Sequence, residues 1–177
     1  MDIIDRCTVL PLKVEQMTIP KNTLSLAAEF AVASELCRRG IYAQLTLGNL
    51  KRTDLLVLDT ENHRMLRIEV KAKQKHSWPN CRGIYGKNIL LVLVDFYQKR
   101  EMERPDFYIL TVEDWVELAH KVIAAHPDDR IELDEYNVLF WPKQNYKGTG
   151  VIPEQVGQHR ERWDKVDAAL AHSASTN

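Results

Sequence analysis

The run ILLVLV, at residues 89–94, is the longest apolar stretch in this chain of 177 residues. A short run that is apolar at every position predicts a strand buried inside a globular core. The run is far too short to cross a bilayer, because a transmembrane helix needs about 20 apolar residues. We therefore expect a protein with a sheet in its core and no membrane-spanning segment.

The residues on either side of this run predict helices and further strands. Asn22 or Thr23 can cap a first helix, Gly40 is a natural stop for it, and Thr111 can cap a second. We expect helices at 24–39 and 112–126, and strands at 8–10, 41–45, 53–58, 65–71, 89–94, 106–110 and 136–141. One stripe predicts a closing helix, with Val156, His159, Trp163, Val166 and Leu170. The fold class is α/β, with a mixed β-sheet flanked by helices.

Composition and charge limit the kind of protein this is. Apolar residues make up 45% and charged residues 28%, which is typical of a soluble globular domain. Cys7, Cys37 and Cys81 form no close pair, so we expect reduced thiols. The first residues, MDIID, show no secretory signal, and we expect a cytoplasmic protein. A net charge of −1 excludes a polycation that coats nucleic acid.

Two acidic residues are expected to face each other in a hairpin around the turn sequence DTENHR. If the strands pair symmetrically about the midpoint between Glu61 and Asn62, Asp54 lies opposite Glu69, with the Cβ atoms about 5 Å apart. Two carboxylates at that distance repel each other unless a divalent cation lies between them. Lys71 is on the same strand face as Glu69, so its ammonium can reach the same point.

A third acidic residue, Glu29, lies on the first predicted helix. It shares an apolar stripe with Leu26, Val32 and Leu36. A carboxylate on a core-facing stripe is costly unless it is paired or binds a metal ion. Two roles for Glu29 are therefore open: an acid of the metal site, or a structural ion pair with Arg52 or Lys71.

Basic residues cluster around the hairpin although the chain as a whole is nearly neutral. Between positions 67 and 87, Glu69 is the single acidic residue among Arg67, Lys71, Lys73, Lys75, Arg82 and Lys87. Lys51 and Arg52 lie just upstream. The cluster indicates a polyanionic partner, but a lysine row is equally typical of a solvated strand edge. Trp78 and Tyr85 in the following loop can either stack on bases or pack in the core.

Three segments together resemble the PD-(D/E)xK nuclease superfamily, which has the restriction-endonuclease-like fold. They are AAEFAVASELCRRG, RTDLLVLD and RIEVKAKQ. The similarity is greatest to the small members that resemble Holliday-junction resolvases, and it covers roughly residues 24–110. It implies an α-β-β-β-α-β core, which we place at about 20–126 of a single domain spanning 1–177. Residues 127–172 would then form a C-terminal extension packed on the core, and 173–177 a flexible tail.

The resemblance also implies roles for individual residues. Asp54 and Glu69 would hold Mg²⁺, or alternatively Mn²⁺, together with the main-chain carbonyl of Val70. Lys71 would be the catalytic lysine, and Glu29 the helix acid near the metal. The resemblance adds Gln74, which matches a polar residue that some members keep just after the lysine. Together with the basic residues of the cluster described above, the expected nucleic-acid contacts are Lys51, Arg52, Lys73, Gln74, Lys75 and Arg82.

The implied reaction is metal-dependent hydrolysis of phosphodiester bonds in DNA by an endonuclease of the repair, recombination, mobile-element or defence type. Lys71 would orient the attacking water, since Asp54 and Glu69 favour its ammonium form. Thr53 stands where the motif has proline, a position that is loose in the superfamily. The alternative is a non-cleaving nucleic-acid-binding or regulatory module of the same fold. A homodimer, or a place in a larger complex, is compatible with either function.

Overall fold

The main sheet has five strands in the order β1-β2-β3-β5-β6 in the computed structural model, which describes residues 18–47 and 52–172. The strands are β1 (Ala43–Leu45), β2 (Leu55–Asp59), β3 (Arg64–Lys73), β5 (Ile89–Asp95) and β6 (Asp106–Leu110). β3 and β5 run parallel, and the other neighbouring pairs are antiparallel. The mixed sheet that the sequence predicts is therefore confirmed.

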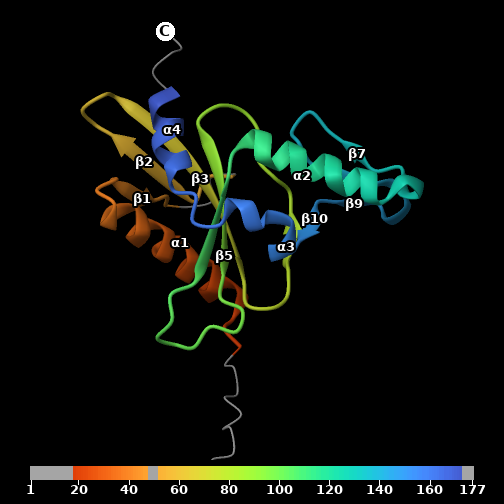
Figure 1. Cartoon of the computed structure of the whole chain (residues 1–177), viewed down its shortest axis with the longest axis horizontal. Helices are drawn as coiled ribbons and strands as arrows, with labels where there is room; N and C mark the ends of the chain where they lie inside the picture. Colours follow the sequence, from red (N-terminus) through yellow and green to blue (C-terminus); the bar gives the residue numbers. More distant parts are fainter. Residues whose placement is uncertain (1–17, 48–51, 173–177) are drawn as a thin grey trace, which may run out of the picture.

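β5 lies at the centre of the core, because every one of its residues is buried. The α-helices are α1 (Lys21–Arg38), α2 (Val112–Ala125), α3 (Pro153–Val156) and α4 (Asp164–His172). One face of β5, with Val92 at its middle, packs against α1 and α4, while the other face, with Leu91, packs against α2 and α3 (Figure 1). Burial on both faces is the physical reason for the uninterrupted apolar run.

An extended segment, rather than a helix, connects the parallel strands β3 and β5. Residues 74–88 include the short strand β4 (Trp78–Cys81), which pairs with β10 (Thr149–Val151). Trp78 is fully buried, and its indole N–H donates to the carbonyl of Val94 at 2.9 Å. Since helices are the usual crossover between parallel strands, the expected α-β-β-β-α-β order needs correction after its third strand. Here β5 and β6 both precede α2.

The two long helices begin for different reasons. The Thr111 hydroxyl accepts from the Asp114 N–H at 3.2 Å, and the Asp114 carboxylate accepts from the Thr111 N–H at 2.7 Å. This capping box confirms Thr111 as the cap of α2. α1 begins directly after Pro20, which makes no side-chain cap. The expected caps Asn22 and Thr23 are wrong, because proline, with φ already fixed, starts the helix before them.

The predicted closing helix is broken, although all five residues of its stripe are buried. A 3₁₀ turn at Gly157–His159 and an extended stretch separate α3 from α4. In that stretch Arg160 forms a β-bridge with Tyr108, and the Glu161 N–H donates to the carbonyl of Phe107 at 2.8 Å. These bonds satisfy part of the outer edge of β6, which a continuous helix would leave unpaired.

Within residues 127–172, which the sequence predicts as a C-terminal extension, a three-stranded sheet is formed by β7 (Glu132–Leu133), β8 (Leu139–Trp141) and β9 (Tyr146–Lys147). The strand predicted at 136–141 is present but shorter, because Tyr136 and Asn137 lie in the turn between β7 and β8. Trp115 of α2 donates its indole N–H to the Asn137 carbonyl at 2.8 Å, which fixes this turn against α2.

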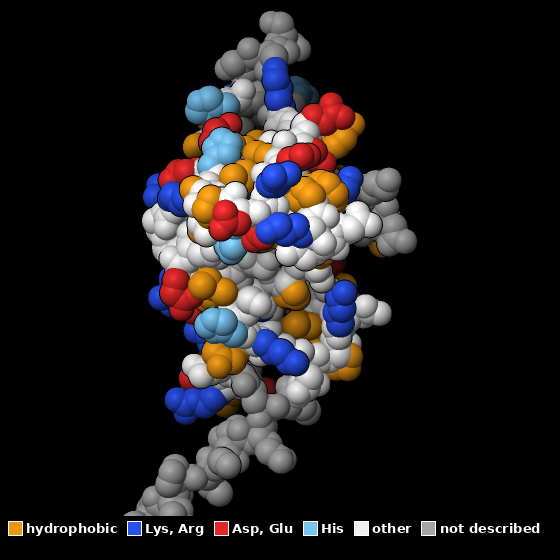
Figure 2. Space-filling view, turned by 90° about the vertical axis from the view of Figure 1, so that its right-hand side faces the viewer, with side chains coloured by type: hydrophobic (Ala, Val, Ile, Leu, Met, Phe, Trp, Pro, Cys, Tyr) orange, Lys and Arg blue, Asp and Glu red, His pale blue; other side chains and the backbone are white. Residues whose placement is uncertain are grey.

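Four predicted features lie outside the described residues: the strand at 8–10, the Cys7 thiol, Lys51 and the tail at 173–177. Within the described ranges, no helix combines the length and the apolar character needed to cross a bilayer. Figure 2 shows the molecule from the side on which α2, β7 and β9 lie, and there the basic and acidic side chains are interspersed. This distribution agrees with the net charge of −1.

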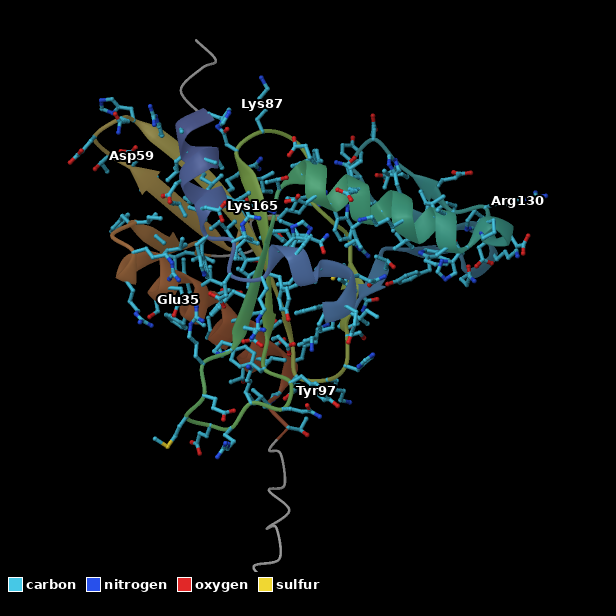
Figure 3. All side chains as sticks on the ribbon, viewed as in Figure 1. Glu35, Asp59, Lys87, Tyr97, Arg130 and Lys165 are labelled. Atoms are coloured by element: carbon cyan, nitrogen blue, oxygen red, sulfur yellow. The ribbon has the colours of Figure 1, made fainter. Side chains whose placement is uncertain are left out.

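A charged network ties α1 to the loop before β6. Glu35 lies on α1 (Figure 3), and its carboxylate accepts from Arg104 at 2.8 and 2.9 Å and from Arg39 at 2.5 Å. Arg104 also donates to Glu161 at 3.0 and 2.8 Å. The hydrogen bonds from Arg104 and Arg39 lower the pKa of Glu35 to about 2, although burial opposes them.

We expect Glu35→Gln to lower the free energy of unfolding at pH 7 by on the order of 2 kcal/mol, a value reduced for the solvent exposure of Arg104. Because the folded pKa of Glu35 is depressed, its contribution is fully present above its ordinary pKa of 4.5 and is lost as the pH falls towards about 2. Urea unfolding from pH 7 to pH 2 measures this. Glu117→Gln, in an exposed pair with Lys121, is the control. A deficit that stays constant down to pH 2 would contradict the assignment.

Candidate active site

β2 separates from β3 at Asp54, and this divergence creates the candidate site. The register expected from the midpoint of the turn is confirmed, because Leu55 pairs with Ile68 and the ladder continues from there to the turn. Asp54 comes directly before the paired residues, and its N–H donates to the Ile68 carbonyl at 2.8 Å. β3 continues beyond this point to Lys73, and among the described residues no strand pairs with its β2-facing edge there, which we call the open edge of β3.

The Asp54 carboxylate occupies the next position along the edge of β3. Its Oδ2 accepts from the Val70 N–H at 2.6 Å, so the side chain satisfies a main-chain donor that β2 leaves behind. Asp54 therefore lies beside the edge of β3, and the expectation that it directly opposes Glu69 needs this correction. The two carboxylates still interact, since burial first and the Asp54 charge second raise the pKa of Glu69.

Lys71 reaches the same point from the strand face that carries Glu69. Its ammonium donates to Glu69 Oε1, and to the Val70 carbonyl at 3.3 Å. This ion pair lowers the pKa of Glu69 and so opposes the effect of burial, although the net shift remains upward. Lys71 thus contacts two groups, the Glu69 carboxylate and the Val70 carbonyl, to which the sequence resemblance gives a metal-binding role.

Glu29 approaches the site from α1. With Asp54 and Lys71 it lines a cavity of about 750 Å³. Burial raises the pKa of Glu29, and the charges of Asp54 and Glu69 add to that effect, while Lys71 opposes it. An acid with a raised pKa near two other carboxylates is typical of a functional site.

The position of Glu29 on α1 differs in one respect from the sequence prediction. Val32 and Leu36 are buried, as expected, but Leu26 is 48% exposed, so Glu29 lies at the margin of the buried stripe. In the described part of the chain, Lys71 pairs with Glu69, and Arg52 contacts Tyr85 and Tyr136. The structural ion pair of Glu29 with Arg52 or Lys71 is not formed there.

The oxygen donors at this point suit a magnesium ion that keeps several water ligands. They are too few for a metal ion whose ligands all come from the protein. Across residues 18–47 and 52–172, no three His, Cys, Asp or Glu side chains are grouped so as to hold a metal ion. The donors that do meet are the carboxylates of Asp54 and Glu69 and the carbonyl of Val70. Mg²⁺ is commonly bound by one or two carboxylates while it keeps several waters. Water and a substrate phosphate would complete such a site.

A second groove, of about 560 Å³, lies beside Glu69 and Lys71. Its other charged residues are Arg52, Arg67 and Arg82, so four basic groups surround a single acid. Tyr85 and Tyr136 also line it. The sequence prediction includes Arg52 and Arg82 but misses Arg67 and Tyr136 as site residues. Tyr136 carries no sequence signal, because it arrives from the C-terminal extension through tertiary packing.

Lys73 needs correction as a nucleic-acid contact. Its side chain is 1% exposed, and its ammonium pairs with Asp95 at 2.7 Å while lying over the rings of Trp78 and Tyr97. A lysine buried in this way cannot reach a phosphate. Lys75, by contrast, is exposed and lines the same cavity as Glu29.

Gln74 also has a structural role. Its amide accepts from the Ile19 N–H at 2.8 Å and donates to the Ile19 carbonyl at 2.6 Å. These two bonds attach the segment before α1 to the end of β3. A direct contact of Gln74 with nucleic acid would have to break them, so we assign it to holding the wall of the cavity.

Comparison with known proteins identifies a structural relative but no family. No protein-family model matches the chain, and no curated protein matches it. A bacterial homing endonuclease of known structure aligns with it at a TM-score of 0.51 and 16% sequence identity. The alignment covers 90% of this chain and 100% of that one. The fold is shared. At this identity the likeness concerns the fold alone.

The buried position of Lys73 leads to a stability prediction. We expect Lys73→Met to lower the free energy of unfolding by about 3–5 kcal/mol, because Asp95 would be left as an uncompensated buried charge. Lys75→Met, two residues away and exposed, is the matched control and should change it by less than about 0.5 kcal/mol. Urea unfolding of both variants measures the difference. Equal stability of the Lys73→Met and Lys75→Met variants would contradict the structural role of Lys73 and make it a candidate phosphate contact again.

Proposed function

We propose that this protein is a cytoplasmic endonuclease that hydrolyses phosphodiester bonds in DNA with the help of Mg²⁺. The observation that carries the proposal is the meeting of Asp54, Glu69 and Lys71 at the point where β2 leaves β3. A fold shared with a bacterial homing endonuclease supports it. So does Glu29, whose carboxylate is close enough to interact with all three.

Asp54, Glu69 and the Val70 carbonyl are the groups that hold the ion. When bound, Mg²⁺ activates a water molecule as nucleophile and offsets charge on the phosphate. Burial, more than the charge of Asp54, raises the pKa of Glu69, and a bound cation would offset both effects.

Lys71 acts as the charged donor of the site. Its ammonium donates to Glu69 and to the Val70 carbonyl, the groups that would hold the ion. From this position Lys71 would orient the attacking water and donate to phosphate oxygens as negative charge grows on them. Glu29 lines the same cavity as Asp54 and Lys71, where it would take part in orienting water.

The phosphate backbone is held by basic residues that line the two hollows around this point. Arg52 and Arg82 line the groove beside Glu69, and Lys75 lines the cavity beside Glu29. Arginine suits this task, because its planar guanidinium can donate two hydrogen bonds to one phosphate.

We also propose that the chain is a member of the PD-(D/E)xK superfamily, with Thr53 in place of the motif's proline.

A second candidate function is a non-cleaving DNA-binding module of the same fold. The observation that favours it is the ion pair of Lys71 with Glu69, in which a residue of the protein itself balances the charge of Glu69. Titration calorimetry separates the two functions. Heat from Mg²⁺ binding that disappears in Asp54→Asn supports the nuclease, whereas DNA binding with no heat at millimolar Mg²⁺ supports the module.

Substitution of the site residues tests the nuclease directly. We expect Asp54→Asn, Glu69→Gln and Lys71→Met each to lower the cleavage rate by about 100-fold or more, because each removes a group that stabilises the transition state. Chelation of divalent metal should abolish cleavage, and added Mg²⁺ should restore it. Gel assays with linear, branched and single-stranded DNA measure the rate.

The matched control is Asp59→Asn, in the same hairpin but at its turn end, as the label in Figure 3 shows. This variant should cleave at the wild-type rate. Cleavage that persists in all three site variants would refute the site. Equal losses in Asp59→Asn would show that the hairpin, and not the site, had been damaged.

A further inference from the structure

The groove beside Glu69 contains a pair of exposed aromatic rings. Tyr85 is 40% exposed and Tyr136 is 45% exposed. Their ring centroids are 4.9 Å apart, with an edge-to-face angle of 65°. The guanidinium of Arg52 lies 4.8 Å from the centre of the Tyr85 ring. Two large rings that remain in water, next to a cation and the candidate site, offer a surface for a flat ligand.

The backbone near Tyr85 is fixed by close packing. Gly83 has φ +69°, and a Cβ atom there would lie 1.9 Å from the indole nitrogen of Trp115. Only glycine allows this approach, so the chain is pressed onto Trp115 two residues before Tyr85. Trp78, the other aromatic candidate of this segment, is fully buried and cannot reach a ligand.

The turn that carries Tyr136 is held just as firmly. The Asn137 amide donates to the carbonyl of Ile84 at 3.1 Å, which links this turn to the segment of Tyr85. The carboxylate of Asp134 accepts from the N–H groups of Tyr136 and Val138 at 2.9 and 2.8 Å. Arg52 donates to the Tyr136 carbonyl at 3.2 Å. The backbone segments that carry the two rings are therefore fixed by hydrogen bonds between side chains and the main chain before any ligand binds.

The remaining lining of the groove suits a nucleotide. Arg67, Lys71 and Arg82 provide positive charge near the rings, and Glu69 is the single acid. The groove has a volume of about 560 Å³, which lies within the range of ligand pockets, roughly 300–1,000 Å³. Basic groups bind phosphates, and aromatic rings stack on bases, which is the combination found in sites for single-stranded nucleic acid.

We infer that the Tyr85 and Tyr136 pair receives an unpaired base next to the phosphate that is cleaved, with the base stacked on the face of one ring and in contact with the other, so that the substrate is DNA with unpaired nucleotides. In duplex DNA the faces of the bases are covered by neighbouring bases. A tyrosine ring in this groove could therefore stack only on a base that has left the duplex stack. Single-stranded, flapped and branched DNA present such bases without the cost of extrusion. This inference rests on the proposed nuclease function.

Binding to two DNAs of one sequence tests the inference. One is a blunt duplex, and the other carries a short unpaired arm with 2-aminopurine at the junction. Fluorescence anisotropy in EDTA measures affinity without cleavage. We expect Tyr85→Ala and Tyr136→Ala each to weaken binding of the unpaired DNA by about ten-fold, because the stacked base is lost, with little change for the duplex. Emission of 2-aminopurine should fall on addition of the wild-type protein and not of Tyr85→Ala.

Two controls keep the test specific. Tyr85→Phe retains the ring and should bind like the wild type. Tyr42→Ala removes an exposed tyrosine outside the groove and should also have no effect. Equal binding of both DNAs by the wild type, or equal losses for both in the alanine variants, overturns the stacking role and leaves the nuclease proposal standing. Absence of binding to either DNA overturns the stacking role, whereas the nuclease proposal is decided by the cleavage assay with Mg²⁺.

Discussion

The hydrogen bond from the Val70 N–H to the Asp54 carboxylate is the interaction on which the candidate site depends. Where β2 turns away from β3, a main-chain donor would otherwise be left without a partner, and an unpaired donor costs free energy comparable to a lost hydrogen bond. Asp54 satisfies it, and the same bond places a carboxylate at the open edge of β3. The divergence of the strands and the position of the acid are therefore one structural feature.

The second half of β3 is the rigid element that presents the other groups. Its residues alternate, so that Glu69, Lys71 and Lys73 share one face. The buried ion pair of Lys73 with Asp95 holds this end of β3 in the core. Glu69 and Lys71, on the same face of the strand, line the groove. Glu69 is largely buried, which raises its pKa, and Lys71 offsets only part of this. Because Lys71 compensates only part of the cost of burying Glu69, binding of a cation at this site would stabilise the folded protein.

The sequence predicts the parts of this arrangement that depend on local pattern. The apolar run at 89–94, the turn residues of the hairpin and the cap at Thr111 are local signals, and the structure confirms the elements that they predict. The extended crossover, the break before α4 and the burial of Lys73 arise from tertiary contacts, which periodicity does not encode. For the same reason Tyr136 carries no signal, since it reaches the groove only through the packing of the C-terminal extension.

A crystal soaked with Mn²⁺ tests the central claim most directly, because Mn²⁺ scatters anomalously and takes the same oxygen donors as Mg²⁺. The account predicts one anomalous peak beside the open edge of β3, about 2.1 Å from oxygens of Asp54, Glu69 and Val70. Lys71 should then have moved away from Glu69. A fully soaked crystal with no peak there, and with the ion pair of Lys71 and Glu69 intact, would contradict the account.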